Sequence, residues 1–572
     1  MLKYLKKYRM ECVCAPLFKM FEALLDLLVP LAVASIIDRG IGQGSAAHIW
    51  RMCGLLVALG LVGLAAAITA QYFAARAATG FAADVRHALF ERLAGLSFED
   101  VDRLGTSAMI TRMTSDVNQA QTAVNMALRL LLRSPFVVLG AMVMAFTIDA
   151  RCALIFLAVI AALAVVVYII MSASLPMMRG VQRQLEAVLG ATRENLAGAR
   201  VIRAFRREGA EYQAFRAKNR ELTSRQRRAG RVSALLNPVT YALINAAVIV
   251  LVNQGAIRVD AGALTTGQVV ALYNYMSQIL VELVKFAGLT VTINKGWASW
   301  KLVADALALT PSMDSPAGDP AEPAQGAPAV EFRHVRFSYP GAGSCALEDI
   351  DFAVMPGETV GIIGGTGSGK SSLAALIPRY YDASEGQVLV KGVDVRKWPL
   401  ARLRQSVGMV MQKASLFKGT IRDNLLWGDP AASDAALNEA ARIAQAGDVL
   451  AVKGGLDGEV AQNGGNLSGG QRQRLTIARA LVRRPEILIL DDSASALDMA
   501  TDARLRAAIA KLDYSPTVFI ISQRTASIMN ADLILVLDDG RVVGKGTHAQ
   551  LLERCPIYRE IYDSQFQGEA SA

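Results

Sequence analysis

The sequence has 572 residues, of which 53% are hydrophobic and 19% are charged, and its mean hydropathy is +0.32. This apolar excess excludes an intrinsically disordered chain and argues against a purely soluble protein. The net charge is +14 over residues 1–310 and −4 over residues 311–572, so the basic residues belong to the apolar half, which favours membrane-flanking loops over a nucleic-acid partner.

Six apolar segments in the first half suit membrane-spanning helices, which need about 20 apolar residues each. Four runs contain no Asp, Glu, Lys or Arg: 52–75, 152–178, 232–257 and 261–281. A shorter uncharged run covers 134–148 and extends backward through 130–132. The N-terminal segment, about 14–37, is interrupted by charged residues. No small-residue cleavage site follows the basic N-terminus, so we interpret the first segment as an uncleaved span.

Two long polar stretches separate these segments, at about 80–125 and 179–231. The second holds 14 Lys and Arg against 5 Asp and Glu. The positive-inside rule therefore predicts that both stretches and both termini are cytoplasmic. We expect helices that continue beyond the membrane, with tips near 107–118 and 207–216 that contact a cytoplasmic domain.

Charged residues also lie at the predicted membrane depth. Glu22 and Asp26 are four residues apart and share a helix face, and Glu282 and Lys285 are three apart and can pair. Such residues face a bundle interior or a water-filled cavity. They indicate either a polar substrate pathway or a structural ion pair.

A composition change divides the chain. Residues 311–329 are rich in Pro, Ala and Gly without apolar periodicity, which predicts a linker. Strand-like segments begin at once after it. We therefore expect a transmembrane domain over 1–310 and a separate domain over 330–572.

A phosphate-binding loop lies early in the second domain. The segment 364–371 matches G-x-x-x-x-G-K-[ST], with an apolar strand before it and a helix after it. We expect Lys370 to reach the β- and γ-phosphates and Ser371 to hold Mg²⁺. The nucleotide-binding residues predicted here are Gly364, Gly365, Thr366, Gly367, Ser368, Gly369, Lys370, Ser371 and Ser372.

Two further motifs complete the predicted nucleotide chemistry. Residues 487–491 form a buried apolar strand that ends at Asp491, which can coordinate Mg²⁺ through water, and Asp492 follows where a base or water-orienting group would lie. The segment 467–471 precedes a helix, so its amides form a second anion site. Its binding residues are Ser468, Gly469, Gly470 and Gln471. One nucleotide does not need two such sites on one chain, which points to a site shared between two copies of the domain.

These motifs, in this order and spacing, resemble the ATP-binding cassette (ABC) transporter family over essentially the whole chain. The resemblance implies a half-transporter of the exporter type: a membrane α-helical domain of six helices followed by an α/β P-loop ATPase domain, with ATP and Mg²⁺ as cofactors. By the same resemblance, Tyr339 stacks on adenine, Gln412 touches Mg²⁺ and senses the membrane domain, and residues 495–498 form the D-loop. The stretches near 107–118 and 207–216 look like its coupling helices.

The sequence departs from the family pattern at two catalytic positions. The family has glutamate after the strand aspartate and histidine in the H-loop, whereas this chain has Asp492 and Gln523. The aspartate carboxylate retreats by roughly 1–1.5 Å, and a misplacement near 1 Å can cost about 100-fold in rate. An amide cannot carry the charge or shuttle the proton of histidine. With Gln412, these residues predict a site that binds MgATP and turns it over slowly.

The signature segment 467–471 is intact and would serve the other site of a dimer. The chain thus resembles the degenerate-site subunit of heterodimeric bacterial multidrug exporters, and we expect a second half-transporter as its partner, with a slow homodimer as the alternative. The predicted function is ATP-driven export of a lipophilic small molecule across the bilayer of a bacterial inner (plasma) membrane. An exporter-fold importer, as for siderophores, and a non-pumping ATP-regulated membrane protein stay open.

Overall fold

The computed structural model describes residues 1–316 and 326–566. Residues 317–325 of the predicted linker, and the last six residues of the predicted second domain, therefore lie outside the described residues. The chain forms two compact units. The first contains Met1–Ala94 and Ser107–Leu309, and the second contains Gly95–Thr106 and the chain from Thr310 onward.

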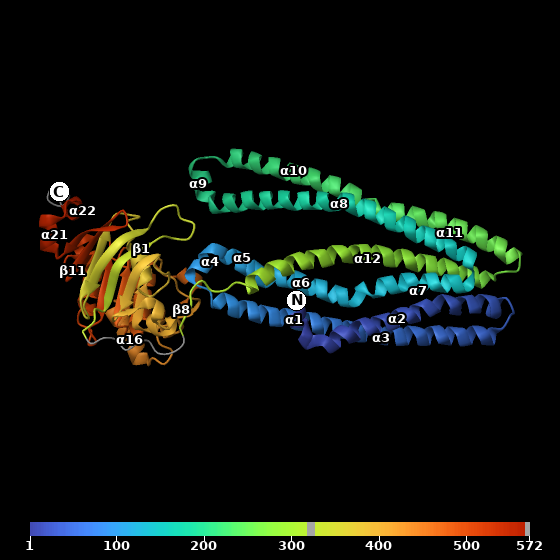
Figure 1. Cartoon of the computed structure of the whole chain (residues 1–572), viewed down its shortest axis with the longest axis horizontal. Helices are drawn as coiled ribbons and strands as arrows, with labels where there is room; N and C mark the ends of the chain where they lie inside the picture. The colour runs from blue at the N-terminus through green and yellow to red at the C-terminus, as the bar shows by residue number, and fades with distance from the viewer. Residues whose placement is uncertain (317–325, 567–572) are drawn as a thin grey trace. The chain divides into compact units, whose positions relative to one another are not determined.

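The first unit is entirely helical over its described residues (Figure 1). Six stretches are long and apolar enough to cross a membrane, which confirms the six predicted spans. The helices are α1 (Leu2–Leu5), α2 (Arg9–Ser35), α3 (Ala46–Ala94), α5 (Thr106–Thr111), α6 (Val117–Met126), α7 (Arg133–Ile148), α8 (Ala150–Ala197), α9 (Ala199–Ala204), α10 (Glu208–Ala234), α11 (Leu236–Asp260) and α12 (Thr266–Leu307).

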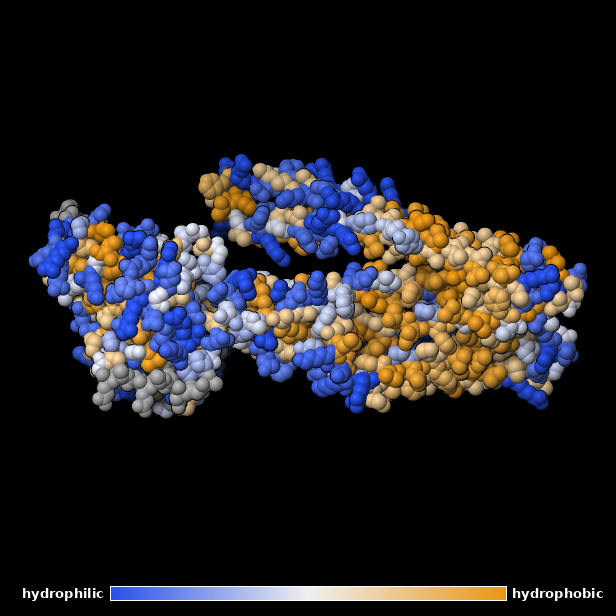
Figure 2. All heavy atoms as spheres, viewed as in Figure 1, coloured by the Kyte–Doolittle hydropathy of each residue, from blue (hydrophilic) through white to orange (hydrophobic). Residues whose placement is uncertain are grey.

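The spans expose their apolar side chains. In α3 only 6% of the most apolar window is buried inside the chain, so its apolar residues face outward. Figure 2 shows hydrophobic residues gathered over the spans and hydrophilic residues over the extended ends of α8 and α10. Exposed apolar surface of this extent requires a lipid environment or another chain.

A network of ion pairs joins three of the spans at the level of the predicted charges. Arg133, at the start of α7, donates to Glu282 of α12 (2.5 Å) and to Asp26 of α2 (2.9 Å). Glu282 also accepts from Ser134 (2.9 Å) and Lys285 (3.0 Å). The pairing of Glu282 with Lys285 was predicted, whereas no pattern in the sequence indicated Arg133. These ion pairs connect α2, α7 and α12, which supports the structural ion pair over the substrate pathway.

This network predicts a stability difference between two ion pairs of the same unit. Replacing Glu282, whose side chain is 5% exposed beside an Arg133 that is 11% exposed, leaves a buried guanidinium short of its main partner, which costs about 3–5 kcal/mol. Replacing Glu221, which pairs with Arg225 on the exposed face of α10, costs about 0–1 kcal/mol. Glu282→Ala should therefore lower the thermal unfolding midpoint in one detergent well below that of Glu221→Ala. Equal midpoints would contradict the role given to the network.

The second unit is an α/β domain with a mixed six-stranded sheet and a four-stranded antiparallel sheet. Its strands are β1 (Val330–Phe337), β2 (Leu347–Val354), β3 (Thr359–Gly364), β4 (Glu385–Val390), β5 (Val393–Asp394), β6 (Val407–Val410), β7 (Gly419–Thr420), β8 (Glu459–Val460), β9 (Ile487–Asp491), β10 (Thr517–Ile521), β11 (Leu533–Asp538) and β12 (Arg541–Gly546). Its helices are α4 (Phe98–Leu104), α13 (Lys370–Leu376), α14 (Leu400–Ser406), α15 (Ile421–Leu426), α16 (Asp434–Ile443), α17 (Gly447–Lys453), α18 (Gly469–Val482), α19 (Met499–Ile509), α20 (Thr525–Ile528), α21 (His548–Arg554) and α22 (Pro556–Phe566).

The six-stranded sheet has the order β12-β11-β3-β10-β9-β6, in which all neighbours except β11 and β12 are parallel. The strands β3, β9 and β10 are buried almost throughout, as expected for parallel strands covered on both faces. Because parallel strands end at the same edge, the segments that follow β3, β6, β9 and β10 converge there. Those segments carry the phosphate loop, Gln412, Asp492 and Gln523.

The helix α4 belongs to the second unit although it lies between two helices of the first. Ser97 and Asp100 cap it reciprocally, Phe98 stacks on Tyr380 with ring centroids 4.3 Å apart, and Asp102 accepts from the Tyr381 hydroxyl (2.6 Å). Asp100 also accepts from the Ser312 amide (2.9 Å). Although burial raises the pKa of Asp100, hydrogen bonds from Ser312 and Ser97 hold it below its ordinary value. The loop between α3 and α5 is thus packed on the ATPase fold.

Both predicted loop tips were placed too far along the chain. The first turn lies between the end of α3 at Ala94 and the start of α5 at Thr106, so residues 107–118 already belong to the returning helices. The second turn contains α9 and precedes α10, which starts at Glu208. Charge density alone could not locate either turn, because charged residues continue along the helices before and after each turn.

Candidate functional site

The phosphate loop joins β3 to α13 in the conformation that its glycines allow. Gly367 and Gly369 have positive φ angles of 86° and 94°, and a Cβ at Gly369 would lie 2.6 Å from the Ala346 carbonyl oxygen. The Lys370 ammonium donates to the carbonyl oxygens of Gly364 (2.9 Å) and Gly365 (2.6 Å). Burial lowers the pKa of Lys370, against the carboxylates of Asp492 and Asp491, which raise it. The loop therefore surrounds a partly desolvated cation beside a helix N-terminus, an arrangement that attracts phosphate.

A pair of oxygen donors lies next to this cation. The Ser371 hydroxyl donates to Asp491 Oδ1 (2.9 Å). This hydrogen bond brings the end of β9 next to the phosphate loop, with the two oxygens side by side. Burial raises the pKa of Asp491, and the Ser371 hydrogen bond opposes that rise. A hydroxyl and a carboxylate are the ligands that Mg²⁺ accepts beside a nucleotide phosphate, so these residues fit that ion.

The predicted adenine aromatic, Tyr339, also lines the pocket. The Tyr339 hydroxyl shares a hydrogen bond with Ser372 Oγ (2.9 Å). Its ring meets the edges of Phe337 and Tyr381, with centroids 4.8 and 5.3 Å apart. Because Tyr381 also donates to Asp102 of α4, Tyr381 and Asp102 connect this aromatic to the loop between α3 and α5.

The two atypical residues lie in the same pocket as the phosphate loop. Gln412 Nε2 donates to Asp492 Oδ2 (3.3 Å). Asp492 has a positive φ angle of 44°, and its amide donates to the Ile521 carbonyl oxygen (3.0 Å), so its backbone is held by the neighbouring strand β10. The pocket has a volume of about 330 Å³ and is lined by Tyr339, Ala346, Thr366, Gly367, Gly369, Lys370, Ser371, Ser372, Gln412, Asp491, Asp492, Ile521, Ser522 and Gln523.

The signature residues lie in a different hollow. Ser468 and Gln471 form a reciprocal cap at the start of α18. With Gly470 they line a hollow that also includes Ala496, Leu497 and Asp498 of the predicted D-loop. None of these residues is among those that line the phosphate-loop pocket of the described chain. The phosphate loop and the signature thus line two separate hollows of one chain.

Two residues that the sequence did not indicate hold the H-loop in place. Arg524 donates to the carbonyl oxygens of Leu497 (3.2 Å) and Ser495 (3.4 Å) in the D-loop. Gln565 of α22 donates to the Gln523 carbonyl oxygen (2.7 Å) and accepts from the Thr525 amide (2.8 Å). Gln565 belongs to no motif and contacts a loop 42 residues away, so no sequence pattern could have identified it.

Comparisons with known proteins agree with this geometry. The family described as "ABC transporter transmembrane region" matches residues 12–283, and the family described as "ABC transporter" matches residues 347–495. An uncharacterized ABC transporter ATP-binding protein of Mycobacterium tuberculosis is 36% identical over 98% of this chain and 97% of its own length.

Other relatives extend this similarity. The uncharacterized ABC transporter ATP-binding protein YfiB of Bacillus subtilis is 34% identical over 100% of this chain and 99% of its own length. An ATP-dependent lipid A-core flippase of Pseudomonas fluorescens is 34% identical over 86% of this chain and 81% of its own length. The solved structure of a bacterial Atm1-family ABC exporter with ATP bound has a TM-score of 0.82 at 24% identity, with 98% of each chain covered, and shows that the fold is the same.

The two hydrogen bonds of Gln565 predict how the H-loop responds to its loss. Gln565→Ala removes the acceptor of the Thr525 amide, and a typical hydrogen bond contributes about 1 kcal/mol. Hydrogen–deuterium exchange of the H-loop should therefore accelerate about fivefold. Gln565→Glu keeps that acceptor but cannot donate to Gln523, so it should accelerate exchange less.

The matched control is Ser564→Ala. The Ser564 hydroxyl bonds only within α22, to the Ile561 carbonyl oxygen, so H-loop exchange should stay unchanged in this variant. Equal exchange in Gln565→Ala and Ser564→Ala would mean that α22 does not hold the H-loop.

Proposed function

Because this chain belongs to the ABC transporter family, we propose that it is one subunit of an ATP-driven exporter whose own phosphate loop binds MgATP and hydrolyses it slowly. The observation that carries this proposal is that Asp492 and Gln523 line the same pocket as Lys370 and Ser371. The pocket has the residues expected to bind a nucleotide, whereas the two positions expected to promote its hydrolysis carry other residues than the family pattern.

Binding of MgATP is supported by side chains suited to phosphate, Mg²⁺ and adenine that line one pocket. Lys370 and the loop amides would hold the β- and γ-phosphates. Ser371, Asp491 and Gln412 would hold Mg²⁺, which supplies charge neutralisation at the phosphates when it is bound. Tyr339 would lie against adenine, with its position fixed by Ser372 and Tyr381.

Slow hydrolysis is supported by the short side chain of Asp492 and by the chemistry of the Gln523 amide. The Asp492 carboxylate is one methylene shorter than glutamate, and its Oδ2 is engaged by Gln412 at 3.3 Å. Its backbone cannot advance to compensate, because the Asp492 amide and carbonyl are both hydrogen-bonded, to Ile521 and to the Ser495 hydroxyl. Gln523 can donate a hydrogen bond to a phosphate oxygen but cannot move a proton. The attacking water therefore lacks a well-placed base.

A dimer with a second half-transporter is supported by the separation of the signature hollow from the phosphate-loop pocket. ABC exporters work as dimers, and here Ser468 and Gly470 line a hollow distinct from the phosphate-loop pocket. This chain would give its intact signature to a second half-transporter that carries the usual catalytic glutamate and histidine. We favour this heterodimer over a slow homodimer, because both changes fall at one site.

The proposed cargo is a lipophilic small molecule or lipid, exported from a bacterial inner membrane with both termini and the ATPase domain in the cytoplasm. The apolar exterior of the six spans and the similarity to lipid A-core flippases support an amphiphilic cargo. The contact of Tyr381 with both Tyr339 and α4 supports coupling, because a nucleotide that fixes Tyr339 also fixes a neighbour of the loop between α3 and α5.

The test restores the two family residues. Asp492→Glu together with Gln523→His should raise ATP turnover of the purified chain in nanodiscs by about tenfold or more, because a base misplaced by about 1 Å costs up to about 100-fold. ATP affinity should change little, because neither residue grips the nucleotide. Release of phosphate at saturating MgATP measures the gain.

Adding Lys370→Ala to the double variant is the control. Loss of the gained activity would show that turnover occurs at this chain's own site. Unchanged turnover in the double variant would overturn the slow-site proposal. Robust turnover in the unaltered chain alone would instead establish a homodimer with Asp492 as an adequate base.

A further inference from the structure

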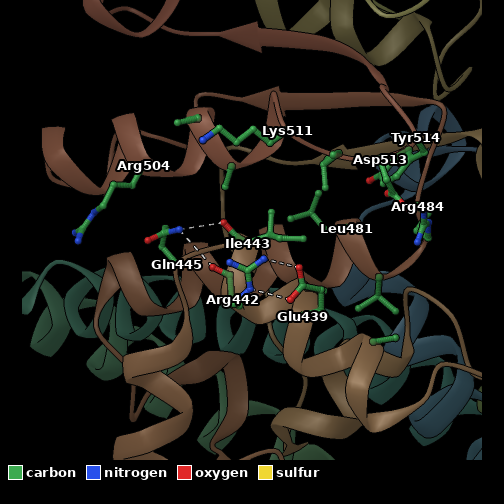
Figure 3. A pocket seen from close by; sticks show the side chains of 16 residues that line it. Glu439, Arg442, Ile443, Gln445, Leu481, Arg484, Arg504, Lys511, Asp513 and Tyr514 are labelled. Carbon is green, nitrogen blue, oxygen red and sulfur yellow. Dashed lines mark hydrogen bonds and ion pairs between the residues drawn. The ribbon is translucent and has the colours of Figure 1, made fainter.

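The ATPase unit contains a second groove, away from the phosphate loop. It has a volume of about 590 Å³ and lies among the C-terminal part of α16, the C-terminal ends of α18 and α19, and the segment that leads to β10 (Figure 3). Its apolar lining consists of Ala436, Ala440, Ile443, Leu481, Val482, Ala507, Ala508 and Leu512. Small-molecule sites in proteins have volumes of about 300–1,000 Å³ with such apolar walls and a few polar groups.

The charges around the groove are unbalanced. Glu439 pairs with Arg442 (2.6 Å) and Asp513 pairs with Arg484 (2.6 Å), so both carboxylates of the lining are already engaged. Neither Lys511 nor Arg504 forms a salt bridge with a described residue.

Arg504 donates only to the Thr501 hydroxyl (3.2 Å). Figure 3 shows Arg504 and Lys511 on the side of the groove away from Arg484 and Asp513, with their charged ends apart from each other. Asp498 interacts electrostatically with Arg504, so Lys511 is the lining cation for which the described residues offer no carboxylate partner.

The opposite side of the groove contains an unsatisfied polar group. The Tyr514 hydroxyl is buried and has no hydrogen-bond partner in the described structure, and the Arg484 guanidinium lies 4.9 Å from the centre of its ring. A buried hydroxyl without a partner is destabilising, and such groups are usually satisfied by water or a ligand. The groove therefore offers a cation on one side, an apolar floor, and a polar group on the other side.

We infer that this groove is a binding site for an amphipathic organic anion, a single carboxylate or comparable acid on an apolar body. The acid would lie against Lys511. The body would cover Ile443, Leu481 and Leu512. A neutral apolar molecule would leave Lys511 without a partner, and a compact inorganic anion would leave the apolar floor exposed.

The groove is placed to influence the ATPase site of a dimer. The helix α18 runs from the signature to Leu481 and Val482 in the groove wall, and α19 runs from the D-loop to the same wall. Arg442, Gln445 and Arg504 line both the groove and the signature hollow. An occupant therefore contacts the far ends of both helices that present residues to a partner's nucleotide.

The experiment uses two probes of equal shape and different charge. The full chain in lipid nanodiscs is titrated with 4-(trifluoromethyl)benzoate and, separately, with the neutral 4-(trifluoromethyl)benzamide. Binding is followed by the ¹⁹F relaxation of each probe after subtraction of empty nanodiscs. The benzoate should bind at least about fivefold more tightly than the amide, because one charge contact of about 1 kcal/mol corresponds to that factor.

Two substitutions locate the bound probe. Ala508→Trp fills the groove and should abolish benzoate binding, whereas Ala503→Trp, on an exposed position of α19 outside the groove lining, should leave it unchanged. Lys511→Glu should weaken benzoate binding about fivefold or more, whereas Lys545→Glu, on the exposed edge of β12, should not. Retained binding of a fluorescent ATP analogue shows that each variant is folded.

Equal affinity for the two probes, absence of benzoate binding, or benzoate binding that survives both Ala508→Trp and Lys511→Glu would overturn the inference. If Ala508→Trp fails to fold, Lys511→Glu with its matched control still decides. These outcomes do not depend on ATP hydrolysis, so the inference and the slow-site proposal succeed or fail separately.

Discussion

The parallel register of β3, β10, β9 and β6 is the constraint on which the nucleotide site depends. It brings four segments that are far apart in sequence to one sheet edge, and each contributes one part: a phosphate grip, an H-loop side chain, the two aspartates and Gln412. The strand interiors are buried, so packing fixes where each segment begins. Substitution at a position just after a strand, such as Asp492, therefore alters chemistry without disturbing the fold that positions its neighbours.

The edge of the sheet is also supported from outside. On one side, α4 stacks Phe98 on Tyr380 and bonds Asp102 to Tyr381, which touches the aromatic Tyr339. On the other side, Gln565 of α22 holds both sides of the H-loop, and Arg524 ties that loop to the D-loop. Tyr339 is thus linked through Tyr381 to the loop between α3 and α5, and Gln523 lies beside Arg524, which contacts the D-loop. Each of these links is a single hydrogen bond or ring contact.

Local sequence patterns predicted the parts of this structure that have local causes. Uncharged runs predicted the spans, since a bilayer requires them, and the glycines of the phosphate loop predicted its strand-loop-helix context, since only that turn needs them. Several features escaped prediction: the turns at α4 and α9, Arg133 as a partner of Glu282, and the contacts of Arg524 and Gln565. Each depends on which side chains meet across the fold, as when Arg133 of α7 reaches Glu282 of α12, and a one-dimensional pattern contains no record of such a meeting.

A site that grips MgATP but lacks a well-placed base has a use that a fast site does not. A ligand that binds only the closed state stabilises it by an amount that grows with the logarithm of ligand concentration over the dissociation constant, and this stabilisation lasts as long as the ligand remains intact. In a dimer with one slow site, ATP at Lys370 and Ser371 would keep the two ATPase domains associated through many turnovers at the other site. With Asp492 and Gln523, this site would then serve to keep the dimer closed, and ATP would be hydrolysed mainly at the other site. Lys370, Ser371 and Asp491 lie beside those two changes, and this is the combination that such a role requires: residues suited to hold MgATP next to residues poorly suited to hydrolyse it.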